Sequence, residues 1–285
     1  MQKMQIGFIR PVLVISCVVT IFAGNDNYPN HQFVFEALKN VDFKSREQNQ
    51  PNKLRVLENI RVSGSAQFSK MSLEEIIRKI KAHDNFPIVI LDVRQEMHLL
   101  GDGDLSQTIA EKDWSEINHK LEFIIKDEDA LVQPGLLERE EIIVDKLGLK
   151  YLRVPVTDDS VPSERAVDTF LEFYKEQIKN HQNTWFHVHC EHGHGRTTTF
   201  MSMLHILNTQ GKIRLSDILE EQCVSGGADL SFPLKKKLES KDLHLQQERF
   251  AFLEEFHQYV NDREVGFCAG KSWSEWKKNV SEIAE

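Results

Sequence analysis

The sequence predicts an α/β fold, in which helices flank a central, mostly parallel sheet, and three observations support this. Short apolar runs of strand length alternate along the chain with amphipathic stretches of helix length, the order typical of such layered folds. Residues 86–92 form a continuous apolar run that ends in a polar residue, as in a strand buried on both faces. A glycine-containing loop then joins the run at 185–190 directly to an apolar helical stretch.

The first helix is expected just after residue 70. Ser72 and Glu75 have the spacing of a capping box, and Met71 is placed to pack against Ile76. Further strands are predicted at 150–156 and 185–190, and further helices at 138–147, 167–178, 200–207 and 245–260. The polar residues 25–67 and the segment 101–133 show neither pattern, and they leave room for a small accessory lobe.

The N-terminus has a different character from the rest of the chain. Lys3 and Arg10 lie before an apolar run of 13 residues, Pro11–Ala23. This is the pattern of a secretory signal peptide. Such a helix rises about 20 Å, too little to cross a hydrocarbon core of about 30 Å. We therefore expect a signal peptide at 1–23, an N-terminal extension at 24–60, a phosphatase-like domain at 61–262 and a C-terminal tail at 263–285. The mature protein would be periplasmic or secreted, without stable membrane insertion.

The composition limits the classes of function. The chain of 285 residues carries 35 Lys and Arg against 44 Asp and Glu, a net charge of −9. A general nucleic-acid binder needs a broad basic face, so we expect no nucleic-acid partner, and a polyanionic substrate would need a local basic pocket. Removal of the signal peptide leaves Cys190, Cys223 and Cys268, an odd number. A disulfide scaffold is thus excluded, while a Cys223–Cys268 bridge and the oligomeric state stay open.

The stretch that carries chemistry reads HCEHGHGRT from His189 to Thr197, between a predicted strand and a predicted helix. Backbone N–H groups of such a loop can turn inward, and the helix dipole favours a bound phosphate. Arg196 can return over this cradle and hold two phosphate oxygens. The same donors favour a thiolate at Cys190, which can attack phosphorus, and Thr197 is placed to hydrogen-bond the sulfur.

A metal site is the rival interpretation, because His and Cys are good ligands for zinc or copper. Its ligands would come from His187, His189, Cys190, His192 and His194. His187 and His189 share one face of the predicted strand, whereas Cys190 lies on the opposite face. We therefore expect no metal and no cofactor. The residue before the cysteine is expected to orient the loop by hydrogen bonding. The two loop histidines are either solvated or contact further phosphates, which their protonation in mild acid would favour.

Three other segments resemble the same known family as this loop. Together with residues 189–199, the segments 62–69, 91–96 and 154–158 look like the motifs of the bacterial protein tyrosine phosphatase-like phytases, which dephosphorylate myo-inositol hexakisphosphate. The resemblance covers roughly residues 61–260. It implies a PTP-like fold, a two-step reaction through a phosphocysteine without a metal, and an aspartic general acid in a mobile loop.

The resemblance also assigns roles to residues of this chain. It implies that Cys190 is the nucleophile, Arg196 the phosphate clamp and Asp158 the general acid. The family usually has His after this Asp, whereas Asp159 follows here, so the choice between the two carboxylates stays open. The candidate phosphate- and substrate-binding residues are Glu191, His192, Gly193, His194, Gly195, Thr197, Asp159, Arg94, Lys235 and Lys236.

Several alternatives stay open beside this hypothesis. Asp92 and Arg94 either brace or line the site or form a structural ion pair, and the basic run at 235–241 is either a solvated face or a source of positive potential. Arg249 lies on a helix that contributes basic contacts in the family, but the spacing does not match it to one of them. A protein tyrosine, dual-specificity or phosphoinositide phosphatase is the in-class rival to an inositol polyphosphate phosphatase. An inactive phosphate-binding module is the rival of another class.

Overall fold

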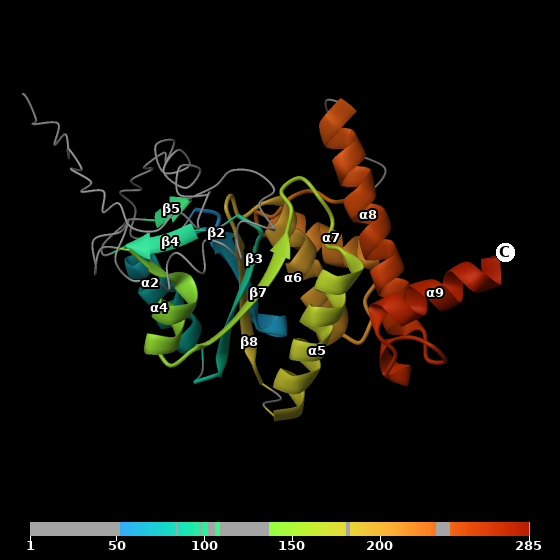
Figure 1. The fold of residues 1–285 in the computed structure, drawn as a ribbon, viewed down its shortest axis with the longest axis horizontal. Coiled ribbons are helices and arrows are strands. Elements are labelled where there is room, and N and C mark those ends of the chain that lie inside the picture. Colours follow the sequence, from blue (N-terminus) through green and yellow to red (C-terminus); the bar gives the residue numbers. More distant parts are fainter. Residues whose placement is uncertain are drawn as a thin grey trace, which may run out of the picture. The chain divides into compact units, whose positions relative to one another are not determined.

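A five-stranded sheet forms the centre of the protein (Figure 1). The computed structural model describes residues 52–83, 85–96, 98–101, 106–108, 137–180, 183–231 and 240–284. The strand order is β1-β2-β8-β3-β7, with bounds Arg55–Leu57 (β1), Val62–Ala66 (β2), Ile88–Arg94 (β3), Lys150–Val156 (β7) and Trp185–Cys190 (β8). β1 is antiparallel to β2 and all other pairs are parallel. The predicted α/β fold with a mostly parallel sheet is confirmed.

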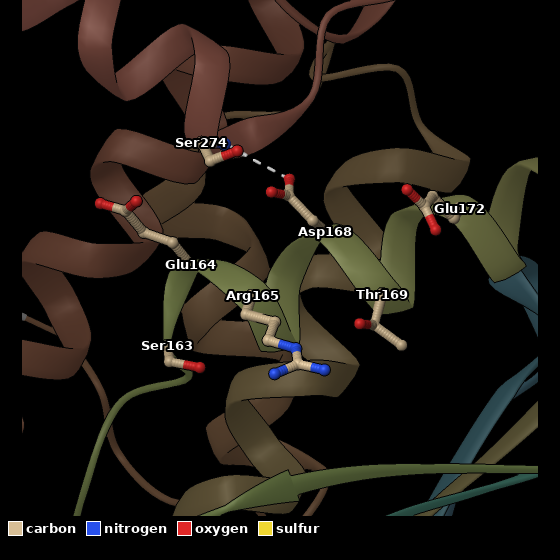
Figure 2. A pocket seen from close by; sticks show the side chains of 7 residues that line it. All are labelled: Ser163, Glu164, Arg165, Asp168, Thr169, Glu172 and Ser274. Atoms are coloured by element: carbon tan, nitrogen blue, oxygen red, sulfur yellow. Dashed lines mark hydrogen bonds between the residues drawn. The ribbon is translucent and has the colours of Figure 1, made fainter.

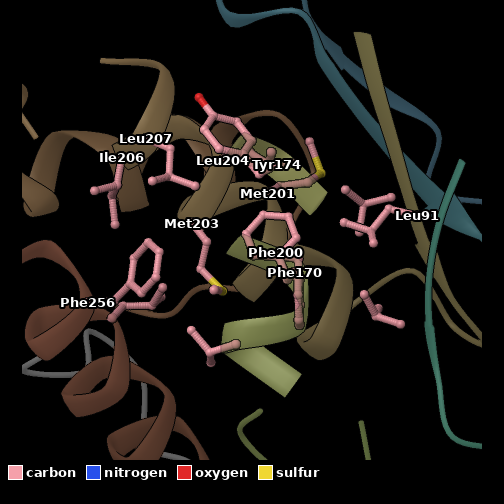
Figure 3. Close-up of a cluster of buried hydrophobic side chains, with 14 of the residues drawn as sticks. Leu91, Phe170, Tyr174, Phe200, Met201, Met203, Leu204, Ile206, Leu207 and Phe256 are labelled. Atoms are coloured by element: carbon pink, nitrogen blue, oxygen red, sulfur yellow. The ribbon is translucent and has the colours of Figure 1, made fainter. Parts of the chain in front are cut away.

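Helices cover both faces of this sheet. In Figure 1, α2 (Lys70–Lys81) and α4 (Glu140–Lys146) lie on one side, and α5 (Glu164–Asn180), α6 (Gly195–Asn208), α7 (Leu215–Val224) and α8 (Ser240–Asn261) lie on the other. The side chains of β3 explain its continuous apolar sequence. Ile88 and Ile90 pack in the core under α2 and α4, whereas Val89 and Leu91 pack in the core of α5 and α6. Figure 3 shows the second core, in which rings and thioethers from α5, α6 and α8 interlock.

A second, three-stranded antiparallel sheet flanks α4. Its order is β5-β4-β6, with bounds His98–Gly101 (β4), Ser106–Thr108 (β5) and Leu137–Arg139 (β6). It borders the segment 109–136, which lies outside the described residues. The predicted signal peptide at 1–23 and Lys235 and Lys236 also lie outside them.

The start of α2 differs from the predicted capping box. Its N-cap is Ser69, whose hydroxyl accepts a hydrogen bond from the Ser72 amide at 3.2 Å, while the Ser72 hydroxyl accepts one from the Ser69 amide at 2.8 Å. The box therefore begins three residues earlier than predicted. Glu75 instead pairs with Arg78 on the surface at 2.7 Å, and Met71 is 44% exposed, so it does not pack as a staple.

Two segments at the edges of the predicted domain take part in the same fold. β1 lies within residues 24–60, which the sequence set apart as an extension, and it pairs with β2. Residues 263–285, set apart as a tail, contain the turn η2 (Phe267–Ala269) and α9 (Trp273–Ala284). Trp273 and Trp276 are buried against Tyr259 of α8.

The structure also describes two of the cysteines and the apolar character of the helices. Cys223 and Cys268 are free thiols, so the bridge left open by the sequence is not formed. Across the described part of the chain, no helix combines the length and the apolar character needed to span a membrane.

Candidate active site

The loop after β8 carries the predicted phosphate cradle. Cys190 ends β8, Arg196 lies in the first turn of α6, and both side chains are buried. Because α6 begins at Gly195, the amides of its first turn and its dipole point toward the loop. Gly193 has a φ of 65°, and a Cβ there would collide with the backbone of Ser65 and Ala66. Both its conformation and its surroundings therefore require glycine.

The guanidinium of Arg196 is held from three sides. It donates hydrogen bonds to Glu96 Oε2 at 2.8 Å and to the Val156 carbonyl at 3.0 Å, and its Nη2 lies 3.0 Å from Asp158 Oδ1. Burial alone would raise the pKa of Glu96, but the hydrogen bond and charge of Arg196 and the charge of Arg94 hold it below its ordinary value. An ionised Glu96 thus fixes the clamp. The sequence placed Glu96 in a family motif but gave it no role.

The two adjacent aspartates face different cations. Asp158, whose side chain is 53% exposed, pairs with Arg196 at the mouth of the cradle. Asp159 is exposed, with a φ of 54°, and it acts on Arg249. Burial lowers the pKa of Arg249, and the negative charges of Asp159, Cys190 and Asp158 oppose that shift. Arg249 packs on Gly195, where a side chain larger than hydrogen would meet its guanidinium.

Arg55 of β1 supports the cradle from behind and was missed in the sequence. Its Nη1 donates to the Gly193 carbonyl at 2.9 Å, and its Nη2 donates to Thr198 Oγ1 at 3.1 Å. Burial lowers the pKa of Arg55 to about 10, while the charge of Cys190 acts in the opposite direction. No local pattern marks this arginine, because the groups it holds are more than a hundred residues away along the chain.

Arg94 braces the site. It is buried, its Nη1 donates to Gln67 Oε1 at 2.9 Å, and its guanidinium faces Glu96 at 3.6 Å and Glu191 at 3.7 Å. Glu191 also accepts a hydrogen bond at its carbonyl from the Gln67 amide at 3.0 Å. These contacts fit a brace built from ion pairs, and the contact of Arg94 with substrate stays a prediction.

Three more predicted site residues lie on or next to the cradle. The Thr197 side chain is buried, and its hydroxyl faces the Ser65 carbonyl at 3.5 Å, so its role at the sulfur stays a prediction. His192 and His194 are both exposed. The His194 ring is nevertheless partly enclosed, and this desolvation, followed by the charges of Lys53, Arg55 and Arg249, lowers its pKa to about 4.

The histidines proposed for the rival metal site do not converge with Cys190. His187 hydrogen-bonds through Nδ1 to Ser63 at 2.9 Å and through Nε2 to Ser65 at 3.1 Å. His189 hydrogen-bonds to Glu140 at 2.7 Å. In the described part of the chain, the His, Cys and carboxylate group close enough to share an ion is Asp92, His98 and Glu140, and it includes none of the proposed ligands.

A separate open hollow lies at the start of α5 (Figure 2). Its lining residues are Ser163, Glu164, Arg165, Asp168, Thr169, Glu172 and Ser274. Asp168 accepts hydrogen bonds from the backbone amides of Trp273 at 2.7 Å and Ser274 at 3.3 Å. This carboxylate therefore caps α9, and the hollow contains none of the cradle residues.

A family model matches the part of the chain that contains the cradle. The model is that of the PTP-like phytases, its description names inositol hexakisphosphate, and it matches residues 39–208. The chain belongs to the PTP-like phytase family. This confirms the resemblance carried by the sequence motifs and places the family's region across β1 to α6.

Solved structures of PTP-like phytases share the fold. The tandemly repeated phytase of Mitsuokella multacida has a TM-score of 0.68 and 25% identity, over 84% of this chain and 48% of that chain. The PTP-like phytase of Bdellovibrio bacteriovorus has a TM-score of 0.66 and 29% identity, over 83% of this chain and 94% of that chain. The PTP-like myo-inositol phosphatase of Mitsuokella multacida was also solved in complex with myo-inositol-(1,3,4,5)-tetrakisphosphate. That structure has a TM-score of 0.66 and 25% identity, over 84% of this chain and 48% of that chain.

One curated relative is the effector protein hopD2 of Pseudomonas syringae pv. tomato. It is 26% identical over 144 residues, which are 50% of this phytase-family chain and 29% of the effector. The chain therefore spans less than a third of that relative's length.

Proposed function

We propose that this member of the PTP-like phytase family is an exported cysteine phosphatase, which removes phosphate from myo-inositol polyphosphates, phytate included. The observation that carries the proposal is the pairing of Arg196 with Asp158 at 3.0 Å above the loop that begins at Cys190. The proposed nucleophile Cys190, anion clamp Arg196 and acid Asp158 would then act at the same entrance to the loop. The complex of the Mitsuokella relative with an inositol tetrakisphosphate supports the substrate class.

The reaction requires two displacements at phosphorus. The Cys190 thiolate attacks the phosphorus, the bond to the inositol oxygen breaks, and that oxygen takes a proton from Asp158. Water then attacks the phosphocysteine, gives its proton to Asp158, and the thiolate leaves. In the overall reaction, a phosphate ester and water are converted to an alcohol and inorganic phosphate. The cradle amides and Arg196 neutralise the charge on the transferred group in both steps.

The ion pairs at the mouth favour Asp158 over Asp159 as the acid. A substrate phosphate that takes the fork of Arg196 replaces the carboxylate that the fork now contacts. Asp159 acts on Arg249 instead, on the side of α8.

The basic groups around the cradle suit a substrate with several phosphates. Lys53, Arg55 and Arg249 all act electrostatically on His194 at the cradle rim, although the whole chain is acidic. Arg249 Nε is buried and has no hydrogen-bond partner in the described part of the structure. It is therefore a candidate to bind a phosphate group next to the one in the cradle.

A comparison of substrates tests the proposal. Phosphate release from phytate, a phosphotyrosine peptide, phosphoinositide vesicles and an aryl phosphate should give the highest kcat/KM for phytate. A preference for the peptide or the vesicles would support the protein or lipid phosphatase instead. Tight phytate binding by calorimetry without any release would support the inactive binding module.

Export is a separate part of the proposal, supported by Lys3, Arg10 and the apolar run to Ala23. Mass spectrometry of the protein from its native host should find about the first 23 residues absent, in the periplasmic or extracellular fraction. An intact N-terminus in the cytoplasmic fraction would contradict export.

A further inference from the structure

A buried carboxylate on the side of the sheet opposite α6 connects several parts of the active site. Glu140, the first residue of α4, is 2% exposed. Its Oε1 accepts a hydrogen bond from His189 Nε2 at 2.7 Å, and its Oε2 accepts from His98 Nε2 at 2.8 Å and from Gln67 Nε2 at 3.1 Å. Burial would raise the pKa of Glu140, but the charges and hydrogen bonds of the two histidines hold it well below its ordinary value.

Both ring nitrogens of His98 lie within hydrogen-bond distance of oxygen atoms. Nδ1 lies 3.0 Å from the Glu96 carbonyl, and Nε2 lies 2.8 Å from Glu140 and 3.5 Å from Asp92. Arg153 lies 3.4 Å from Asp92 and supplies a positive charge beside this buried carboxylate.

Tyr151 and His189 complete the polar groups that the surrounding elements direct into this cluster. The Tyr151 hydroxyl donates to Asp92 Oδ2 at 2.8 Å, and burial first, then the charges of Asp92 and Glu140, raise its pKa well above the ordinary value. His189 points into the same cluster and donates through Nε2 to Glu140.

Two chains of contacts run from Glu140 to the catalytic groups. One passes through His189, the residue before Cys190 on β8. The other passes through His98 to the backbone of Glu96, whose side chain holds Arg196 at 2.8 Å. Glu140 therefore connects the nucleophile and the clamp, which come from different elements.

We propose that Glu140 and His98 are positioning residues, which hold Cys190 and Arg196 in register from behind the sheet without contacting substrate. His98 belongs to β4, so this arrangement also makes the three-stranded sheet a support of the cradle. The proposal rests on the proposed function only for its activity measurements. Anion binding by the cradle tests it independently.

The central variant is Glu140→Gln, which keeps size but removes the charge and leaves one oxygen for two histidines. We expect kcat to fall by about 10- to 100-fold, because the bound phosphate is misaligned, while KM rises by no more than the roughly tenfold loss expected for anion binding. The factor should be the same for phytate and an aryl phosphate, since positioning acts at phosphorus and not on the leaving group. Circular dichroism at the assay temperature verifies that the variant is folded.

The matched control is Glu141→Gln, at the next position of α4. The Glu141 side chain is 59% exposed and faces Arg139 at 3.7 Å. This variant should keep wild-type kcat. A double-mutant cycle of Glu140→Gln with Glu96→Gln should be non-additive, because both changes misplace the same guanidinium. Additive effects would contradict the contact chain through His98.

Tungstate binding, measured by calorimetry, separates this proposal from the proposed function. Glu140→Gln should bind tungstate about tenfold more weakly than the wild type, and Glu141→Gln should not. If the wild type cleaves no ester but this difference holds, the proposed function fails and the positioning role stands. A folded Glu140→Gln with wild-type kcat and tungstate affinity overturns the positioning role alone. His98→Gln carries the same expectations if Glu140→Gln does not fold.

Discussion

At the scale of single residues, the arrangement of Asp158 and Asp159 separates two neighbouring carboxylates. One contacts the clamp Arg196, and the other acts on Arg249 of α8. Because the residues are adjacent in sequence, no spacing argument could distinguish them. The positive φ of Asp159 turns the backbone at this point, and the two side chains then serve different neighbours.

Substitution of each aspartate tests this assignment. Asp158→Asn should cut kcat on phytate by roughly 10²- to 10⁴-fold, because an inositol alkoxide leaves poorly without a proton. An aryl phosphate, with its better leaving group, should lose much less. Asp159→Asn should stay within about tenfold of wild-type kcat on both substrates. The reverse pattern, measured by steady-state phosphate release, would make Asp159 the acid.

His187 ties the stability of the fold to pH. The Ser65 hydroxyl donates to the Ala66 carbonyl at 2.6 Å, so its oxygen accepts a hydrogen bond from His187 Nε2. Burial, with the charge of His189 next, lowers the pKa of His187 to about 3. The unfolded chain, with a pKa near 6.5, binds the proton first as pH falls. Stability therefore rises with pH between these two values.

Urea unfolding at two pH values measures this effect. From pH 7 to pH 5 the wild type should lose about 2 kcal/mol through His187. His187→Asn should show a shallower loss over the same range, although it is less stable at pH 7. The exposed His244→Asn serves as control and should keep the wild-type slope. Equal slopes in all three proteins would contradict the assigned neutral state.

At the scale of elements, local patterns were sufficient for the catalytic loop and insufficient for its supports. Cys190 and Arg196 were found because turn, strand and helix signals all lie within one short segment. β2 was not predicted, because its VSGSA sequence has no strand pattern and is buried by pairing with both β1 and β8. Arg55 and Glu140 were missed for the same reason, since long-range contacts alone define their roles.

Arg55→Lys tests the support that β1 gives to the cradle. Lysine keeps the charge but lacks the fork that reaches both Gly193 and Thr198. We expect kcat/KM for phytate to fall about 10- to 100-fold, because the loop loses its fixed position. Arg214→Lys, on the surface of α7, is the matched control. Wild-type kcat/KM in a folded Arg55→Lys variant would remove β1 from the support of the cradle.

At the scale of the whole molecule, an acidic chain carries a concentrated basic site. The net charge is −9, whereas Arg55, Arg196 and Arg249 all act on or around Cys190. Such local potential can attract a polyanion against the overall charge.

The general fold and the reaction class were predictable from the sequence. The contacts of Arg94, Thr197 and His194 depend on packing between distant elements.

The response to chelation tests the catalytic machinery as a whole. The proposed transition state is stabilised by backbone amides and Arg196, so EDTA should leave phosphate release nearly unchanged, while vanadate should inhibit strongly. Activity lost on chelation and restored by added zinc would transfer the chemistry to a metal site.

Rapid-quench mass spectrometry of the enzyme with phytate tests the central claim most directly. Early in turnover, the account predicts that a peptide containing Cys190 carries the mass of one phosphoryl group. Cys190→Ser should release no phosphate but should still bind phytate, because the cradle amides and Arg196 remain. Turnover without any phosphoryl group on Cys190, together with substantial activity in Cys190→Ser, would contradict the covalent mechanism.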